Sequence, residues 1–125
     1  MDSVIRRKPA FIRRTRDYMM LSSIDTIYEL VSSITYIADE YHEADGTVTL
    51  SLSNMDIIAN GPDIVSAKKL LVQNIIEYAE EYYSAYEMYY ASPNRKPHLP
   101  YIMKALTAKS PEELEEAVLC RPGES

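Results

Sequence analysis

The order of apolar and polar positions predicts a small fold in which strands and helices are mixed. Residues 9–22 read as two short strands around an arginine-rich turn. Ser22 or Ser23 then precedes apolar residues at helical spacing, which predicts a capped helix that runs to about Ser33. Residues 35–43 are rich in β-forming side chains and predict a longer strand.

The clearest local signal is a β-hairpin after that strand. Asp45-Gly46 supplies two residues that tolerate positive φ, and residues 47–53 then alternate between apolar and polar. Residues 55–59 look like a third, shorter strand, ended by Asn60-Gly61-Pro62. The alternating strand is expected to bury one face, which carries Val48, Leu50 and Leu52.

A long amphipathic helix is predicted next. Asp63 is placed to cap a helix from about Ile64 to Ala91, about 42 Å long at about 1.5 Å per residue. Projected as one continuous helix, six tyrosines share one arc about 140° wide, and the glutamates lie opposite. The tyrosines are Tyr78, Tyr82, Tyr83, Tyr86, Tyr89 and Tyr90, and the glutamates are Glu77, Glu80, Glu81 and Glu87.

The C-terminal third begins with a proline-rich connector, Pro93 to Pro100, followed by a short helix around residues 101–106. Ser110-Pro-Glu-Glu113 is a capping box, and it predicts a helix from Glu112 to about Leu119. That helix is too short to be stable alone in water, so it is expected to dock. Its docking face carries Leu114, Ala117 and Val118.

These elements predict an α+β fold, in which a small, mainly antiparallel sheet packs against one long amphipathic helix with short flanking helices. We expect one domain over residues 1–108 and a capped helix and tail over residues 109–125. Within the domain, residues 8–33 form the first strand–turn–strand–helix, and residues 35–91 form the hairpin with the long helix.

Charge is divided unevenly along the chain. The net charge of −6 combines +4 over residues 1–20 with −10 over the remainder. This division predicts a polyanion as partner of the basic head and a basic protein as partner of the acidic body. No apolar run reaches the length of a membrane span, and the N-terminus has no apolar signal region. We therefore expect no membrane contact and a cytoplasmic location.

The sequence contains no motif typical of a catalytic site. The three glycines form no phosphate-binding loop, and neither histidine lies near a motif that would activate a serine or Cys120. Glu40 and His42 share one face of a predicted strand, but two candidate ligands do not make a metal site. We expect no enzyme, no cofactor and no metal; an enzyme built on Glu40 and His42 would retain a metal tightly through purification.

Tyrosine dominates the aromatic residues, with eleven tyrosines, one phenylalanine and no tryptophan. A tyrosine stripe on a helix is first of all a face that covers a sheet. However, each buried hydroxyl needs a hydrogen-bond partner, and tyrosine is enriched at protein interfaces. The residues alone leave both interpretations open: a core, or a core that continues into an interface.

Three segments resemble bacterial antitoxins. Residues 8–30, KPAFIRRTRDYMMLSSIDTIYEL, resemble the strand–turn–strand–helix of the Phd/YefM antitoxins. Residues 36–79 look like a HicB-type module, with a strand, an Asp-Gly hairpin, two more strands and an amphipathic helix. The tail is similar to antitoxins of RelE/RelB-type systems in SPNRK at 92–96, HLPY at 98–101 and ELEE at 113–116.

The resemblance implies an antitoxin of a type II system, which binds a small basic ribonuclease toxin, blocks it sterically and often represses its own operon as a dimer. Phd-type antitoxins read DNA with a helix that precedes the segment matching Lys8, and this chain begins seven residues earlier. The alternative is a stand-alone DNA-binding regulator that uses the arginine-rich head.

Two sets of binding residues follow from these interpretations. We expect the toxin to bind the tyrosine end of the long helix and the segment from Arg95 to Cys120, through Tyr82, Tyr86, Tyr89, Tyr90, Arg95, His98, Tyr101, Leu114 and Val118. Operator DNA would be contacted by Arg6, Arg7, Lys8, Arg13, Arg14 and Arg16. The expected partners are the cognate toxin, a second copy of the chain and operator DNA.

Overall fold

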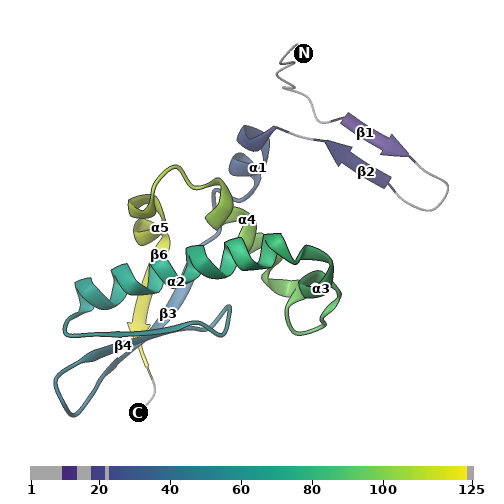
Figure 1. Ribbon diagram of the computed structural model, residues 1–125. Coiled ribbons are helices and arrows are strands. Elements are labelled where there is room, and N and C mark those ends of the chain that lie inside the picture. The colour runs from purple at the N-terminus through teal and green to yellow at the C-terminus, as the bar shows by residue number, and fades with distance from the viewer. Residues whose placement is uncertain (1–9, 14–17, 22, 124–125) are drawn as a thin grey trace.

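The structure is a computed structural model that describes residues 10–13, 18–21 and 23–123. Figure 1 shows a sheet with the long helix α2 laid across it and shorter helices around α2. This is the predicted α+β architecture. The elements are β1 (Ala10–Arg13), β2 (Tyr18–Leu21), α1 (Ile24–Leu30), β3 (Tyr36–His42), β4 (Val48–Leu52), β5 (Ile58–Gly61), α2 (Ile64–Ser84), α3 (Tyr86–Ala91), the 3₁₀ turn η1 (Lys96–His98), α4 (Leu99–Thr107), α5 (Pro111–Ala117) and β6 (Val118–Pro122).

The main sheet has the strand order β5-β4-β3-β6. The pairs β5–β4 and β4–β3 are antiparallel, whereas β3 and β6 run parallel. The two short strands predicted within residues 9–22 are β1 and β2, which pair antiparallel in a sheet of their own. The predicted third strand, residues 55–59, is displaced: β5 covers Ile58–Gly61 and so includes two of the residues expected to end it.

The turn between β3 and β4 uses one residue with a positive φ, although the sequence offered two residues that tolerate it. Only Gly46 takes a positive φ, of 90°, and Asp45 does not. Gly46 N–H donates to the Glu43 carbonyl at 3.0 Å, and the Asp45 carboxylate accepts from Thr47 N–H at 3.0 Å. A single left-handed glycine therefore closes this hairpin, while Asp45 contributes through its side chain.

The core lies between the sheet and α2. Alternate residues of β3 and β4 point into it, including the predicted Val48, Leu50 and Leu52, which are buried. Asp63 caps α2 as predicted, and its carboxylate accepts from Ser66 N–H at 2.7 Å. Gly61 permits close packing of β5 on α2, because a Cβ there would lie 2.7 Å from the Ala67 nitrogen. The core face of α2 consists of Ala67, Leu71, Val72, Ile75, Ala79 and Tyr82.

The long helix predicted from Ile64 to Ala91 is wrong in one respect, because it is broken at Ala85. Ala85 has φ −121° and ψ 42°, and the Ser84 hydroxyl donates to the Glu81 carbonyl at 2.8 Å, a local bond that competes with continued helix. After the break, α3 folds back so that the Tyr89 ring stacks on Tyr82, 5.2 Å between centroids. The single arc of six tyrosines therefore does not exist.

The C-terminal segment departs from the prediction at its end. Ser110 caps α5, and its hydroxyl accepts from Glu113 N–H at 3.3 Å. The helix ends at Ala117, however, and the predicted last turn is the start of β6, which pairs with β3. α4 begins earlier than predicted, at Leu99.

Glu113 at the start of α5 links α5 to α1 and to the loop before α5. One carboxylate oxygen accepts from the Tyr28 hydroxyl on α1, and the other accepts from Lys109 N–H at 3.0 Å. These hydrogen bonds lower the pKa of Glu113, the Tyr28 bond most strongly. Because the carboxyl pKa is lowered on folding, Glu113 stabilises the fold at pH values above its ordinary pKa of 4.5. This stabilisation is lost as the pH falls through the lowered pKa.

No helix in the described part of the chain is long and apolar enough to cross a membrane.

Candidate functional site

Three tyrosines fill the space under the α2–α3 break. The Tyr78 ring meets those of Tyr82 and Tyr89 edge-on, each with centroids 6.0 Å apart, and Tyr82 and Tyr89 are both buried. Each hydroxyl has a partner: Tyr82 donates to the Arg95 carbonyl at 3.1 Å, and Tyr89 donates to Glu81 Oε1 at 2.7 Å. The tyrosine core predicted from the sequence therefore exists, and its hydroxyls are satisfied within the chain.

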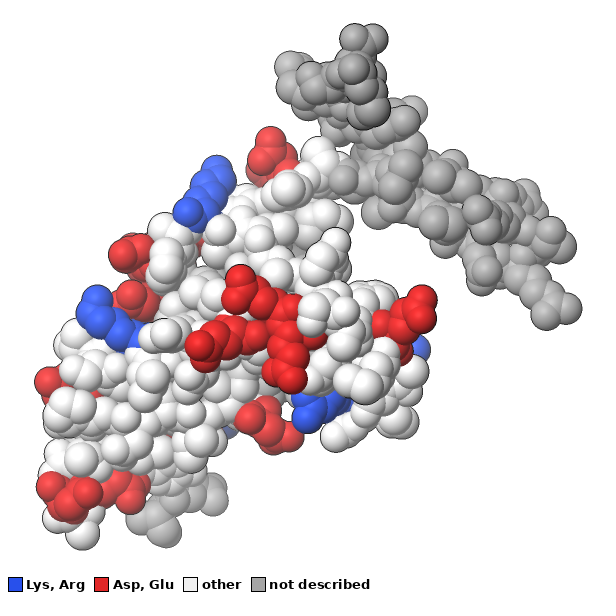
Figure 2. Space-filling view, viewed as in Figure 1, with Lys and Arg blue, Asp and Glu red and all other residues white. Residues whose placement is uncertain are grey.

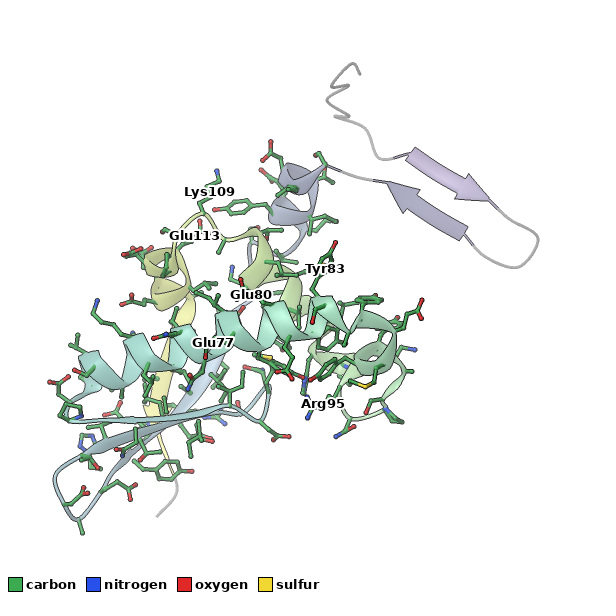
Figure 3. All side chains as sticks on the ribbon, in the orientation of Figure 1. Glu77, Glu80, Tyr83, Arg95, Lys109 and Glu113 are labelled. Carbon is green, nitrogen blue, oxygen red and sulfur yellow. The ribbon has the colours of Figure 1, made fainter. Side chains whose placement is uncertain are left out.

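Arg95 closes this cluster from the side of the connector. Its guanidinium lies 4.9 Å from the centroid of the Tyr89 ring and 5.6 Å from that of Tyr78, within cation–π range. Figure 3 shows Arg95 below α2, at the end where α3 folds back. Arg95 lines a polar cavity of about 420 Å³ together with Asp56, Asn74, Tyr78, Glu81, Asn94 and His98.

His98 also lines this cavity. Its Nδ1 is 2.8 Å from the Tyr78 hydroxyl oxygen. Burial lowers the pKa of His98, and Arg95 lowers it further against the opposing effect of Asp56. Burial likewise raises the pKa of Tyr78. Both groups are therefore neutral at pH 7, and the unprotonated nitrogen of a neutral imidazole can accept a hydrogen bond from the tyrosine hydroxyl. The arrangement ties the connector to α2 by hydrogen bonds and holds no activated nucleophile.

The residues predicted to face a toxin divide into two groups. Four lie in the core: Tyr82, Tyr89, Leu114 and Val118. The other five are half-buried: Tyr86, Tyr90, Arg95, His98 and Tyr101. Only Tyr89, Arg95 and His98 of the nine come together at one cavity. A part for any of the nine in toxin binding remains a prediction.

The half-buried members also make internal contacts. The Tyr86 and Tyr90 rings stack on each other with centroids 5.3 Å apart, and Lys96 Nζ lies 4.9 Å above the Tyr90 ring. The Tyr101 hydroxyl accepts from Asn54 Nδ2 at 3.1 Å, and its carbonyl accepts from the Tyr36 hydroxyl at 2.7 Å. The two Tyr101 contacts hold α4 on β3 and on the loop after β4.

The outer side of α2 presents acidic residues to solvent. Figure 2 shows a concentration of acidic side chains across the middle of this face, and Figure 3 places Glu77 and Glu80 on the exposed side of α2. Within residues 23–123, neither of these two carboxylates has an ion-pair partner. They border a groove of about 430 Å³ between α2 and α5, whose floor includes Val72 and Ile76.

A second groove beside α2 is apolar. It has a volume of about 310 Å³ and lies between α1, α4 and the C-terminal end of α2. Tyr83 lines it and is 66% exposed, although the projection of a continuous helix placed Tyr83 with the buried tyrosines. The exposed glutamates of α2 were predicted from the sequence, whereas this apolar groove was not. The other residues that line the apolar groove are Ile24, Ile27, Met103, Leu106 and Thr107.

The candidate metal ligands form a simple pair. His42 Nε2 lies 2.6 Å from Glu40 Oε2, and the imidazole is mostly exposed. In the described ranges, no three His, Cys, Asp or Glu side chains gather as a metal site would require. Partial desolvation raises the pKa of the Cys120 thiol, which keeps it protonated at neutral pH.

The basic residues predicted to contact DNA fall almost entirely outside the described residues. Arg6, Arg7, Lys8, Arg14 and Arg16 are in this group. Arg13 is the last residue of β1, where its backbone pairs with Tyr18 of β2.

Comparisons with known proteins identify the family of the chain. The PHD-like family, described as the antitoxin of toxin–antitoxin, RelE/RelB, TA system, matches residues 1–120. The chain belongs to this family of antitoxins. No curated protein matches it significantly.

A solved structure extends the comparison to the fold. It is a crystal structure at 1.80 Å resolution of an antitoxin part of a proposed toxin/antitoxin system from Syntrophomonas wolfei subsp. wolfei. The two chains are 27% identical with a TM-score of 0.85, and the match covers 95% of this chain and 86% of that chain. An antitoxin acts on a cognate toxin, so a toxin is the partner for which these surfaces should be considered.

Proposed function

We propose that this antitoxin neutralises a small basic ribonuclease toxin by binding it directly and blocking it sterically. Membership of the antitoxin family over residues 1–120 is the observation that carries the proposal. The charge distribution supports it, since the chain beyond residue 20 carries −10. Unpaired acids on the exposed side of α2 would attract a basic partner and speed its capture. Steric inhibition needs no catalytic residue on the antitoxin.

Co-expression tests this function. The chain is tagged and expressed with the product of the neighbouring reading frame, followed by pull-down and a growth assay. We expect a small basic protein that arrests growth when expressed alone, co-purifies with the tagged chain and is harmless in its presence. Degradation of RNA by the purified toxin, suppressed at one equivalent of antitoxin, would identify a ribonuclease. A harmless neighbour that does not co-purify would contradict the proposal.

We also propose that the protein forms a homodimer that binds operator DNA through its basic head and so regulates its own operon. The +4 charge of residues 1–20 supports phosphate contact, in contrast to the acidic remainder. A stand-alone DNA-binding regulator without a toxin remains the alternative, and it would use the same head. The growth assay separates the two functions, because only an antitoxin suppresses toxicity.

Replacement of Arg13, Arg14 and Arg16 by alanine is expected to abolish operator binding while toxin capture persists. Operator binding is measured by fluorescence anisotropy with the DNA upstream of the operon, at two salt concentrations. Binding by the head should weaken steeply with salt, because each neutralised phosphate releases counterions. The triple variant of Lys68, Lys69 and Lys104 is the matched control, since it removes the same charge from the body. Equal losses in both triple variants would contradict a specific role for the head.

A further inference from the structure

The apolar groove beside α2 is open to solvent at its centre. Ile24 of α1 is 71% exposed, Tyr83 of α2 is 66% exposed, and Leu106 of α4 is 37% exposed. Figure 3 shows Tyr83 projecting from the outer side of α2, beyond Glu80 on the same helix. Three helices thus contribute large apolar side chains to one hollow of about 310 Å³. Solvent-exposed apolar surface of this kind marks binding sites.

Tyr83 differs from the neighbouring tyrosines in its contacts. The inner tyrosines of this region stack on one another and donate hydrogen bonds, as Tyr82 and Tyr89 do. Within the part of the chain that the structure describes, Tyr83 has no ring partner and no hydrogen bond. A large aromatic side chain held outward on a rigid helix, with a free hydroxyl, has the properties of an interface contact residue.

The groove continues around Tyr83 to the α2–α3 break. There Tyr83 and Met88, which is also 66% exposed, line a shallower hollow of about 350 Å³ together with Glu87. Glu80 lies about one helical turn before Tyr83 and is exposed, as is Glu87 after it. Tyr83 therefore stands at the junction of two hollows, with a carboxylate on each side along the chain.

The acids beside Tyr83 indicate which kind of partner fits. In a symmetric dimer formed through this patch, Glu80 and Glu87 would face the same acidic rim on the second copy, at an electrostatic cost. A segment that combines an apolar side chain with Lys or Arg residues would instead fill the hollow and pair with the carboxylates. The charge of the rim therefore favours a basic partner over a second copy.

We propose that the groove around Tyr83 is the docking site for a basic segment of the toxin that inserts an apolar side chain between α1, α2 and α4. This inference rests on the proposed antitoxin function and adds to it the surface that carries the affinity. Tyr83 is the central contact, and Ile24 and Leu106 form the walls. Glu87 in the adjoining hollow and Glu80, which borders the groove between α2 and α5 one helical turn before Tyr83, would hold the flanking cations.

The variant Tyr83→Ala in the full chain tests the docking site. The probe is the toxic product of the neighbouring reading frame, and its binding is measured by biolayer interferometry at fixed salt. We expect Kd to rise at least about tenfold, mainly through faster dissociation, as for an interface hot spot. The variant Tyr83→Phe keeps the ring and should stay within about threefold of the parent. The melting temperature should change little, because the Tyr83 side chain is 66% exposed.

Val65→Ala is the matched control, since Val65 is 61% exposed near the opposite end of α2. It should leave Kd unchanged. If the parent protein captures the toxin and Tyr83→Ala captures it equally well, the docking site is wrong while the antitoxin function stands. If Tyr83→Ala abolishes self-association by light scattering but not toxin binding, the groove is a dimer surface and the inference is overturned. If the parent captures no toxin, both proposals fail together.

Discussion

Replacing Tyr82 with alanine is expected to lower the free energy of unfolding by about 3–5 kcal/mol, the range for removing a buried aromatic side chain. Tyr82 is fully buried, stacks on Tyr89 and donates a hydrogen bond to the Arg95 carbonyl. The substitution would leave a cavity where α2, α3 and the connector meet. Urea-induced unfolding followed by circular dichroism measures the change.

The adjacent tyrosine supplies the control for this prediction. Tyr83→Ala removes the same atoms one residue later, from a side chain that is 66% exposed, and should change stability by less than about 0.5 kcal/mol. Tyr82→Phe removes only the hydroxyl and should cost about 1 kcal/mol. Equal destabilisation by Tyr82→Ala and Tyr83→Ala would show that the assignment of inner and outer tyrosines is wrong.

Neutralising two acids on α2 is expected to slow toxin association at low salt by roughly threefold to tenfold. Glu77→Gln/Glu80→Gln removes two negative charges from the exposed side of α2, where neither carboxylate has an ion-pair partner among the described residues. Steering by exposed charges acts mainly on the association rate, so dissociation should change less. Stopped-flow mixing with the purified toxin measures both.

Glu40→Gln/Glu43→Gln is the charge-matched control at the end of β3. It gives the chain the same net charge but leaves α2 unaltered, so its association rate should stay near that of the parent. High salt should remove the difference between the two double variants, because screening shortens the reach of exposed charges to about 10 Å or less. Equal slowing by both double variants would show that net charge matters and the α2 face does not.

Local signals in the sequence were sufficient for much of the fold. Asp63 and Ser110 cap the helices that follow them, because a short polar side chain can bind a free N–H of the first turn wherever the rest of the chain lies. Gly46 closes the β3–β4 turn by its own conformational freedom. The alternation of Val48, Leu50 and Leu52 likewise gave the buried face of β4.

Features that depend on distant residues were not predictable in this way. The sequence from Glu81 to Tyr86 contains no glycine or proline to mark the break at Ala85. The local Ser84 hydrogen bond competes with continued helix, and the break is accompanied by the long-range stacking of Tyr89 on Tyr82. The first two residues of β6, Val118 and Leu119, were predicted as the end of a helix, because the strand character of β6 depends on its pairing with β3.

The candidate site also depends on residues that are distant in the sequence, so it was only partly predictable. A straight projection put Tyr82 and Tyr83 in one arc, but they are about 100° apart on a helix, and burial separates them completely. Composition and charge identified the acidic character of the body, whereas the apolar groove joins α1 and α4 to α2 and has no signature in a single segment. Its residues come from three separate stretches of sequence.

The parallel pairing of β6 with β3 has a consequence for folding during synthesis. The paired residues Tyr36 and Val118 are about 80 residues apart in the sequence, so a ribosome that adds about 5–20 residues per second separates their synthesis by about 4–16 seconds. During that interval β3 can pair with β4 but has an open edge on its other side, the kind of edge to which foreign strands attach. The sheet is completed only when β6 leaves the ribosome.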